Sequence, residues 1–108
     1  MSSFAPPVGS DHVSFEAMEL AHYDIHVTGR VQGVRFRQSA MEMAISLGVN
    51  GHARNLPDGS VNIVAEGQRQ DLEHLLAWCR IGPPLALVKE VTVKEGPYEQ
   101  HQRFHVKR

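Results

Sequence analysis

The chain has 108 residues and a mass of 12.0 kDa, the size of a single domain, because a second domain would have too little chain for a core of its own. Hydrophobic residues make up 42% and charged residues 21% of the sequence, and no apolar run approaches the roughly 18 residues that a membrane-spanning helix needs. The formal net charge is −1, so the surplus of Lys and Arg that drives non-specific nucleic-acid binding is missing. These values argue against two domains, a membrane span and nucleic-acid binding, and any anion site must be local.

Residues 1–20 differ in composition from the remainder of the chain. They hold three acidic residues and no Lys or Arg, and the first ten positions include two prolines, a glycine and three serines. We therefore predict a flexible extension over residues 1–20 and a folded domain over residues 21–108. The alternative is that Phe15, Met18 and Leu20 dock on the body as a short helical turn. Neither a secretory signal nor a disulfide pair is present, which predicts a cytoplasmic, reducing setting.

The body begins with a strand pattern. Tyr23, Ile25 and Val27 lie on one side of an extended chain and Asp24 and His26 on the other, as in a half-buried strand. After a glycine-containing stretch, the apolar positions change to the spacing of one helix face, and this predicted helix ends at glycine 48. The apolar residues of this helix are Phe36, Ala40, Met43, Ala44 and Leu47.

The second half of the chain repeats these two patterns. A strand over residues 50–54, an Asp-Gly turn at Asp58 and a strand alternating from Val61 predict a hairpin. A second helix precedes Gly82, and strands are expected over residues 87–94 and at the chain end. The apolar positions of this helix are Leu72, Leu75, Leu76 and Cys79, and those of the last strand are Phe104 and Val106. On this helix face Cys79 is expected to be a buried small hydrophobe.

The predicted order is β-α-β-β-α-β-β. This is the order of an α+β ferredoxin-like sandwich, in which an antiparallel sheet of four to five strands carries both helices on one face. Proteins with this fold have unrelated functions, so the function must be inferred from a site.

The segment from Thr28 to Arg37 runs from a strand end through two glycines into a helix N-terminus. Glycines allow the backbone to turn sharply, and the unpaired N–H groups and positive helix end attract anions. The segment is neither a Walker A loop nor a Gly-x-Gly-x-x-Gly motif. By itself this connection is more typical of simple turn geometry than of a phosphate-binding loop.

Four ordered motifs give a more specific signal. Residues 29–37 (GRVQGVRFR), 47–55 (LGVNGHARN), 58–61 (DGSV) and 82–84 (GPP) resemble the acylphosphatase family, and the resemblance extends over about residues 22–107. It implies the ferredoxin-like fold and the hydrolysis of acyl phosphates, with Arg37 and Asn55 as the catalytic pair. The chain departs from the family pattern at His52 and Ala53, where the family usually has a large aromatic and then a β-branched residue, and at its C-terminus (FHVKR), where the family usually ends in Tyr.

The residue types fit this chemistry. The carboxylate that leaves an acyl phosphate has a pKa of about 4 and needs no general acid, so catalysis consists mainly of positioning and charge neutralisation. We expect Arg37 to bind phosphoryl oxygens through its planar fork and Asn55 to orient the attacking water. The backbone N–H groups that complete the cradle are those of Val31, Gln32, Gly33 and Val34. This mechanism requires no metal, cofactor or covalent intermediate. The expected ligands are a small acyl phosphate and inorganic phosphate, as product and competitive inhibitor, and the expected state is a monomer.

Other interpretations of these residues are less specific. Taken singly, Arg37 is a surface arginine and Asn55 a turn residue, and Arg30 and Arg35 are most simply solvated charges. Seven histidines suggest a metal site, but His22, Asp24 and His26 on one strand side are interpreted as an exposed polar face. Neither a His-x-x-Glu-His motif nor paired cysteines accompany them.

A second class of function is a catalytically idle ferredoxin-like binding or regulatory module. An RNA-binding sheet of this topology needs exposed aromatic side chains on its central strands. The sequence offers Asp24, His26 and Asn62 at those positions, which disfavours RNA.

Overall fold

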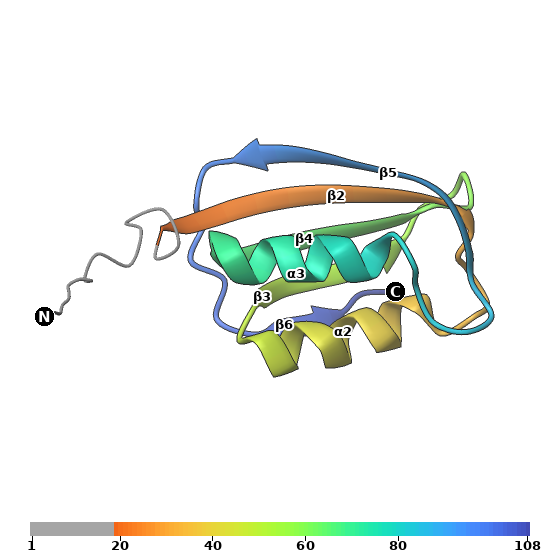
Figure 1. Cartoon of the computed structure of the whole chain (residues 1–108), viewed down its shortest axis with the longest axis horizontal. Coiled ribbons are helices and arrows are strands. Elements are labelled where there is room, and N and C mark those ends of the chain that lie inside the picture. Colours follow the sequence, from red (N-terminus) through yellow and green to blue (C-terminus); the bar gives the residue numbers. More distant parts are fainter. Residues whose placement is uncertain (1–18) are drawn as a thin grey trace, which may run out of the picture.

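The computed structural model describes residues 19–108 (Figure 1). The elements in chain order are β2 (Leu20–Arg30), α2 (Phe36–Leu47), β3 (Asn50–Asn55), β4 (Val61–Gln68), α3 (Arg69–Cys79), β5 (Leu87–Gly96) and β6 (Phe104–Val106). This order confirms the predicted β-α-β-β-α-β-β arrangement. The docking alternative for Phe15 and Met18 lies outside the described residues. Leu20, in contrast, is the first residue of β2 and pairs with Gln68.

The strands form one five-stranded sheet in the order β5-β2-β4-β3-β6. The pairs β2–β5, β2–β4 and β3–β4 are antiparallel, as predicted, but β6 runs parallel to β3, so the sheet is mixed. The cause is the connection between β5 and β6, residues 97–103, which passes the ends of the other strands to the opposite edge (Figure 1). Neither described helix is long and apolar enough to cross a membrane.

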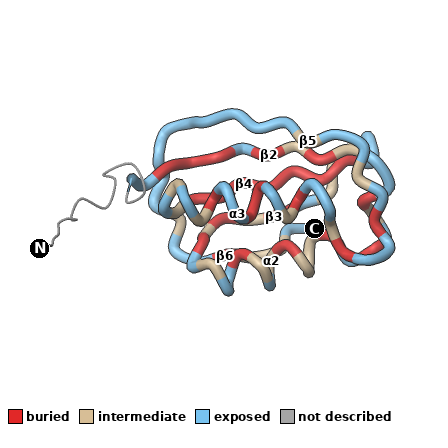
Figure 2. The backbone as a smooth tube through the Cα atoms, viewed as in Figure 1, coloured by how far each residue is buried: buried red, intermediate tan, exposed pale blue. Residues whose placement is uncertain are grey.

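Both helices cover one face of the sheet, and the core lies between the two layers (Figures 1 and 2). Its largest fully buried side chains include Phe36, Ile25, Ile63, Leu72 and Leu75, which come from both helices and the two central strands. Burial of this apolar surface is the main force that holds the helices on the sheet.

The helix ends follow the glycines that the sequence analysis identified. Gly48 has φ 73° and its N–H donates to α2 carbonyls, which ends that helix. α3 ends earlier than expected, at Cys79, although the N–H of Gly82 still donates to the Trp78 carbonyl at 2.8 Å. Cys79 is buried as predicted, and burial raises the pKa of its thiol to about 12, so it is not a nucleophile at neutral pH.

The sheet face opposite the helices differs from the exposed polar face that we predicted for His22, Asp24 and His26. Asp24 is exposed, but His22 is only 8% exposed and its Nδ1 lies 2.6 Å from the carboxylate of Glu66, which is 1% exposed. Burial alone would raise the pKa of Glu66, but hydrogen bonds from the His101 N–H, His22 and the Glu99 N–H lower it. The prediction was wrong for His22 because the connection over residues 97–103 covers this end of the face.

Candidate active site

The connection between β2 and α2 forms a tight loop. Gly33 (φ 75°) and Arg35 (φ 64°) both adopt the left-handed conformation, and Arg35 directly precedes α2. Gly29 has φ 121°, and a Cβ there would lie 2.2 Å from the Leu87 carbonyl oxygen, so the approach of β5 requires glycine. Within residues 19–108, the loop N–H groups of residues 32–35 donate to no acceptor. Together with the α2 N-terminus, they are available to an anion.

A cavity of about 370 Å³ opens beside this loop. It is lined by Val31, Gly33, Arg35, Phe36, Arg37, Gln38, Asn55 and Val106. The structure therefore brings together Arg37 and Asn55, which are far apart in sequence. It also places two of the four predicted loop residues, Val31 and Gly33, in the lining. Gln32 and Val34 are not part of it, and the Val34 side chain is buried in the core.

Arg37 lies in the first turn of α2 and is half-buried. Its Nη1 donates a hydrogen bond of 2.6 Å to the carbonyl oxygen of Lys107, just after β6. This bond limits the positions open to the guanidinium and leaves its other N–H donors for a ligand. The sequence analysis missed the role of Lys107, because a backbone carbonyl has no signature in a sequence.

Asn55 is the last residue of β3 and is half-buried. Among the described residues, the non-glycine positions with positive φ are Arg35 and Gln100, so Asn55 does not serve as a left-handed turn residue. No hydrogen bond joins its side-chain amide to any residue between 19 and 108. Its carbonyl oxygen and NH₂ group are therefore available to water or a ligand.

Gln32 has a function that the sequence analysis did not identify. Its Nε2 donates to the carbonyl oxygens of Leu56 at 2.8 Å and Ser60 at 2.9 Å. These carbonyls belong to the hairpin turn that follows Asn55, so the side chain ties the loop to the turn. The sequence could not show this contact, because the two partner carbonyls lie more than twenty residues from Gln32.

The predicted Asp-Gly turn is also present. Asp58 accepts hydrogen bonds from the backbone N–H of Ser60 at 2.9 Å and from its hydroxyl at 2.5 Å. These bonds lower the pKa of Asp58, and the bond from the Ser60 hydroxyl is the larger cause. The turn therefore holds β3 and β4 in a fixed register beside the cavity.

Two further arginines lie near the loop. Arg35 and Arg30 are both exposed, and Arg35 also lines the cavity. Arg35 and Arg37 make this cavity electropositive, although the whole chain is slightly acidic.

His52 stands where the family that the sequence resembles usually has a large aromatic residue, and the pKa of His52 is lowered to about 4. Burial is the main cause, and the charges of Lys107, His101, His105 and Arg54 add to it. Between about pH 6.5 and pH 4 the unfolded chain therefore binds a proton at this residue that the folded chain does not bind. The free energy of unfolding therefore loses nothing through His52 above about pH 6.5, and it falls as the pH is lowered from 6.5 towards 4.

We predict that His52→Phe reduces the loss of unfolding free energy between pH 7 and pH 5 by about 1 kcal/mol, a value already reduced for the partial exposure of the ring. Urea denaturation of both proteins at the two pH values measures this difference. An equal loss in both proteins would show that His52 does not contribute to the acid sensitivity.

Comparison with known proteins identifies the family of the chain. A sequence model of the acylphosphatase family matches residues 23–106. An acylphosphatase of Trichormus variabilis is 47% identical over 90 residues, which is 83% of this chain and 89% of the relative. The acylphosphatase structure from Bacillus subtilis superimposes with a TM-score of 0.80 at 35% identity and covers 83% of this chain and 100% of that protein. The acylphosphatase structure from Coxiella burnetii superimposes with a TM-score of 0.79 at 36% identity and covers 82% of this chain and 93% of that protein. The chain therefore belongs to the acylphosphatase family.

Proposed function

We propose that the chain hydrolyses small acyl phosphates to a carboxylate and inorganic phosphate by direct attack of water on phosphorus. The observation that carries this proposal is that Arg37, Asn55 and the loop between β2 and α2 line the same cavity. It combines a fixed cation, unpaired backbone donors and an unpaired amide. Family membership supports the same reaction, because the similar proteins are acylphosphatases.

The phosphoryl group binds between the guanidinium of Arg37 and the loop N–H groups. A planar guanidinium can donate to two phosphoryl oxygens, and the backbone groups bind the third. As the bond to the leaving carboxylate lengthens, charge spreads over these oxygens, and the same donors stabilise it. The hydrogen bond from Arg37 to the Lys107 carbonyl positions the guanidinium before substrate arrives.

Asn55 positions the nucleophile. Its carbonyl oxygen accepts a hydrogen bond from a water molecule that attacks phosphorus opposite the leaving group. A P–O bond forms to this water, the P–O bond to the carboxylate breaks, and the protons of the water pass to phosphate and solvent. The leaving carboxylate has a pKa of about 4 and departs without a proton, so no general acid is needed.

The same reaction proceeds without a metal ion. Magnesium in phosphatase sites is held by carboxylates, and the described residues that line this cavity include none. Arg37 supplies the positive charge instead. The purified protein should therefore release phosphate from benzoyl phosphate at the same rate with and without EDTA. Loss of activity in EDTA and its return with magnesium would contradict this mechanism, and no release above the spontaneous rate would contradict the proposed function.

We predict that inorganic phosphate and sulfate inhibit competitively, because each resembles the group that the cavity binds. Initial rates at several benzoyl phosphate concentrations should show a raised KM and an unchanged kcat. A change in kcat alone would place the anion site outside this cavity.

The remaining expectations concern the setting of the protein. A monomer is the expected state of the protein, and the proposed mechanism uses residues of a single chain. A cytoplasmic location stays an inference from the single cysteine, and binding to nucleic acid or membranes is not part of the proposed function.

A further inference from the structure

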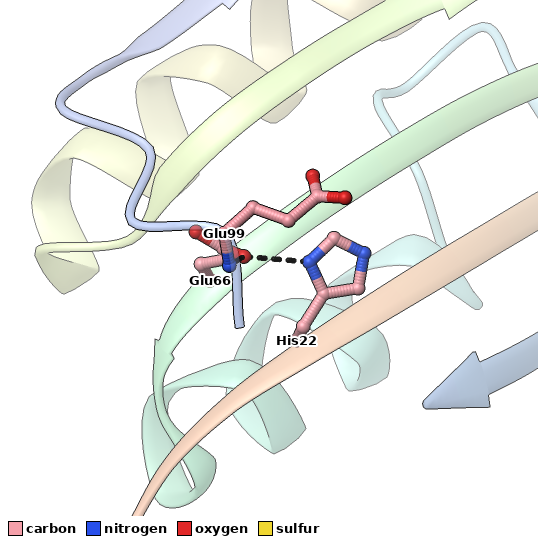
Figure 3. A group of neighbouring side chains, drawn as sticks. All are labelled: His22, Glu66 and Glu99. Atoms are coloured by element: carbon pink, nitrogen blue, oxygen red, sulfur yellow. Dashed lines mark hydrogen bonds and ion pairs between the residues drawn. The ribbon is translucent and has the colours of Figure 1, made fainter. Parts of the chain in front are cut away.

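A buried carboxylate lies on the sheet face opposite the helices (Figure 3). Glu66 of β4 accepts hydrogen bonds from His22 Nδ1 at 2.6 Å, the Glu99 N–H at 2.5 Å and the His101 N–H at 2.7 Å. The bonds from the Glu99 and His101 N–H groups attach the connection between β5 and β6 to the sheet, and the bond from His22 links β2 to β4. The carboxylate is thus fully engaged with protein groups.

The bond to the Glu66 carboxylate, which can only accept, requires a proton on Nδ1 of the His22 ring. With a proton on Nδ1 donated to the carboxylate, a neutral imidazole has its lone pair on Nε2. In metal sites, a histidine that binds the metal through one ring nitrogen commonly donates its other ring N–H to a carboxylate, which orients the ring. The ring edge that carries Nε2 faces Gly96, where a Cβ would lie 3.1 Å from Cδ2 and 3.7 Å from Nε2. Because residue 96 is glycine, the His22 ring can lie close to the β5 backbone, and a larger residue at position 96 would crowd the ring.

Two more candidate ligands lie next to His22. The side chain of Glu99 extends toward the His22 ring (Figure 3), and possible ligand atoms of His22, Glu66 and Glu99 all lie within 4.8 Å of one another. The Nε2 of His101 lies 3.1 Å from Glu99 Oε1, and the ring centroids of His101 and His22 are 6.4 Å apart. The exposed carboxylate of Glu99 therefore lies beside both imidazoles.

We propose that His22, Glu99 and His101 bind one divalent transition-metal ion, Zn²⁺ by preference, and that Glu66 orients His22 without binding the ion. Two histidines and one glutamate with a water as fourth ligand form an established type of zinc coordination. Imidazole ligands disfavour magnesium and calcium, which prefer oxygen. The site joins the start of β2 to residues 99–101, far apart in sequence.

This site differs from the histidine group that the sequence analysis weighed. Of that group only His22 takes part, because Asp24 accepts a hydrogen bond from Asn62 at 2.6 Å and His26 lies 2.8 Å from the Ser60 hydroxyl. Periodicity placed His22 and His26 on one face, but it could not show that Glu99 and His101 come to lie beside His22.

The bound ion would have a structural effect. It fastens residues 99–101 to β2, and the same segment leads into β6, after which the Lys107 carbonyl binds Arg37. None of the three metal-binding residues lines the cavity, so hydrolysis does not require the ion. Zn²⁺ should therefore raise the melting temperature and leave the turnover of benzoyl phosphate unchanged.

The test uses the full chain without an affinity tag, freed of metal by a chelator that is then removed. Isothermal titration with Zn²⁺ measures affinity and stoichiometry, and the visible spectrum with Co²⁺ reports the coordination geometry. The variants Glu99→Gln and His101→Gln remove side-chain ligands but keep the backbone N–H groups that bind Glu66. The matched control is His74→Gln, which alters an exposed histidine on α3 in the other layer.

We expect one Zn²⁺ per chain in the unaltered protein and in His74→Gln, and at least a tenfold weaker affinity in both Glu99→Gln and His101→Gln. No binding to the unaltered protein, full binding in either ligand variant, or an equal loss in His74→Gln would overturn the proposal. Loss in His105→Gln with retention in His101→Gln would overturn it too, because it would place the ion between His52 and His105. Failure to bind Zn²⁺ leaves hydrolysis untouched, so this proposal and the proposed function fail separately.

Discussion

Replacing Arg37 by lysine should lower kcat/KM for benzoyl phosphate by about two to three orders of magnitude, the scale lost when one oxyanion donor is removed. Lysine keeps the positive charge but lacks the planar fork, and it cannot both reach the Lys107 carbonyl and bind two phosphoryl oxygens. Loss of phosphoryl binding in the ground state should raise KM, and loss of stabilisation of the charge that develops in the transition state should lower kcat. Inhibition by inorganic phosphate should weaken in parallel.

The matched control for this variant is Arg30→Lys. Arg30 is exposed and does not line the cavity, so this protein should retain the kinetics of the unaltered chain. Steady-state rates and phosphate inhibition constants of both variants give the comparison, after thermal melts confirm that each is folded. Unchanged phosphate inhibition in Arg37→Lys would show that Arg37 does not bind the phosphoryl group.

Asn55→Ala should lower kcat by about two orders of magnitude or more, while the inhibition constant of phosphate changes little. The reason is that its amide has no partner among residues 19–108 and is assigned to the attacking water, whereas the anion is bound by Arg37 and the loop. The two catalytic variants should therefore differ in phosphate binding even where their turnover is similarly low.

A second asparagine of β3 provides the control. Asn50 Nδ2 donates to the His101 carbonyl at 3.0 Å, so Asn50→Ala should lower the melting temperature and leave kcat unchanged. If folded Asn55→Ala kept near-normal turnover, Asn55 would have no part in catalysis, and another group would have to position the water.

The regular elements were predictable because their causes are local. Alternation in β2, the helical spacing of α2 and the left-handed conformation of Gly48 each depend on neighbouring residues. The parallel direction of β6 was not predictable, because an irregular connection of seven residues decides it. The same connection buries Glu66, because the N–H groups of Glu99 and His101 bind its carboxylate.

The candidate site also combines features with local causes, which the sequence can show, and contacts between distant residues, which it cannot. The loop glycines and the helix start are compatible with an anion site in the sequence, but no local pattern joins Arg37 to Asn55, and only the family resemblance paired them. The hydrogen bonds of Gln32 to the hairpin turn and of Arg37 to Lys107 involve backbone carbonyls of distant residues. Such contacts become visible only when the chain is folded, because carbonyl groups are the same at every position.

The most direct test of the proposed chemistry follows an oxygen isotope. The purified protein hydrolyses benzoyl phosphate in oxygen-18-labelled water with EDTA present, and mass spectrometry locates the label after subtraction of the spontaneous reaction. Attack of water on phosphorus predicts fast enzymatic turnover with the label in inorganic phosphate and none in benzoate. Label in benzoate would show attack on the acyl carbon, and absence of enzymatic turnover would show that this cavity does not hydrolyse acyl phosphates; either result contradicts the account.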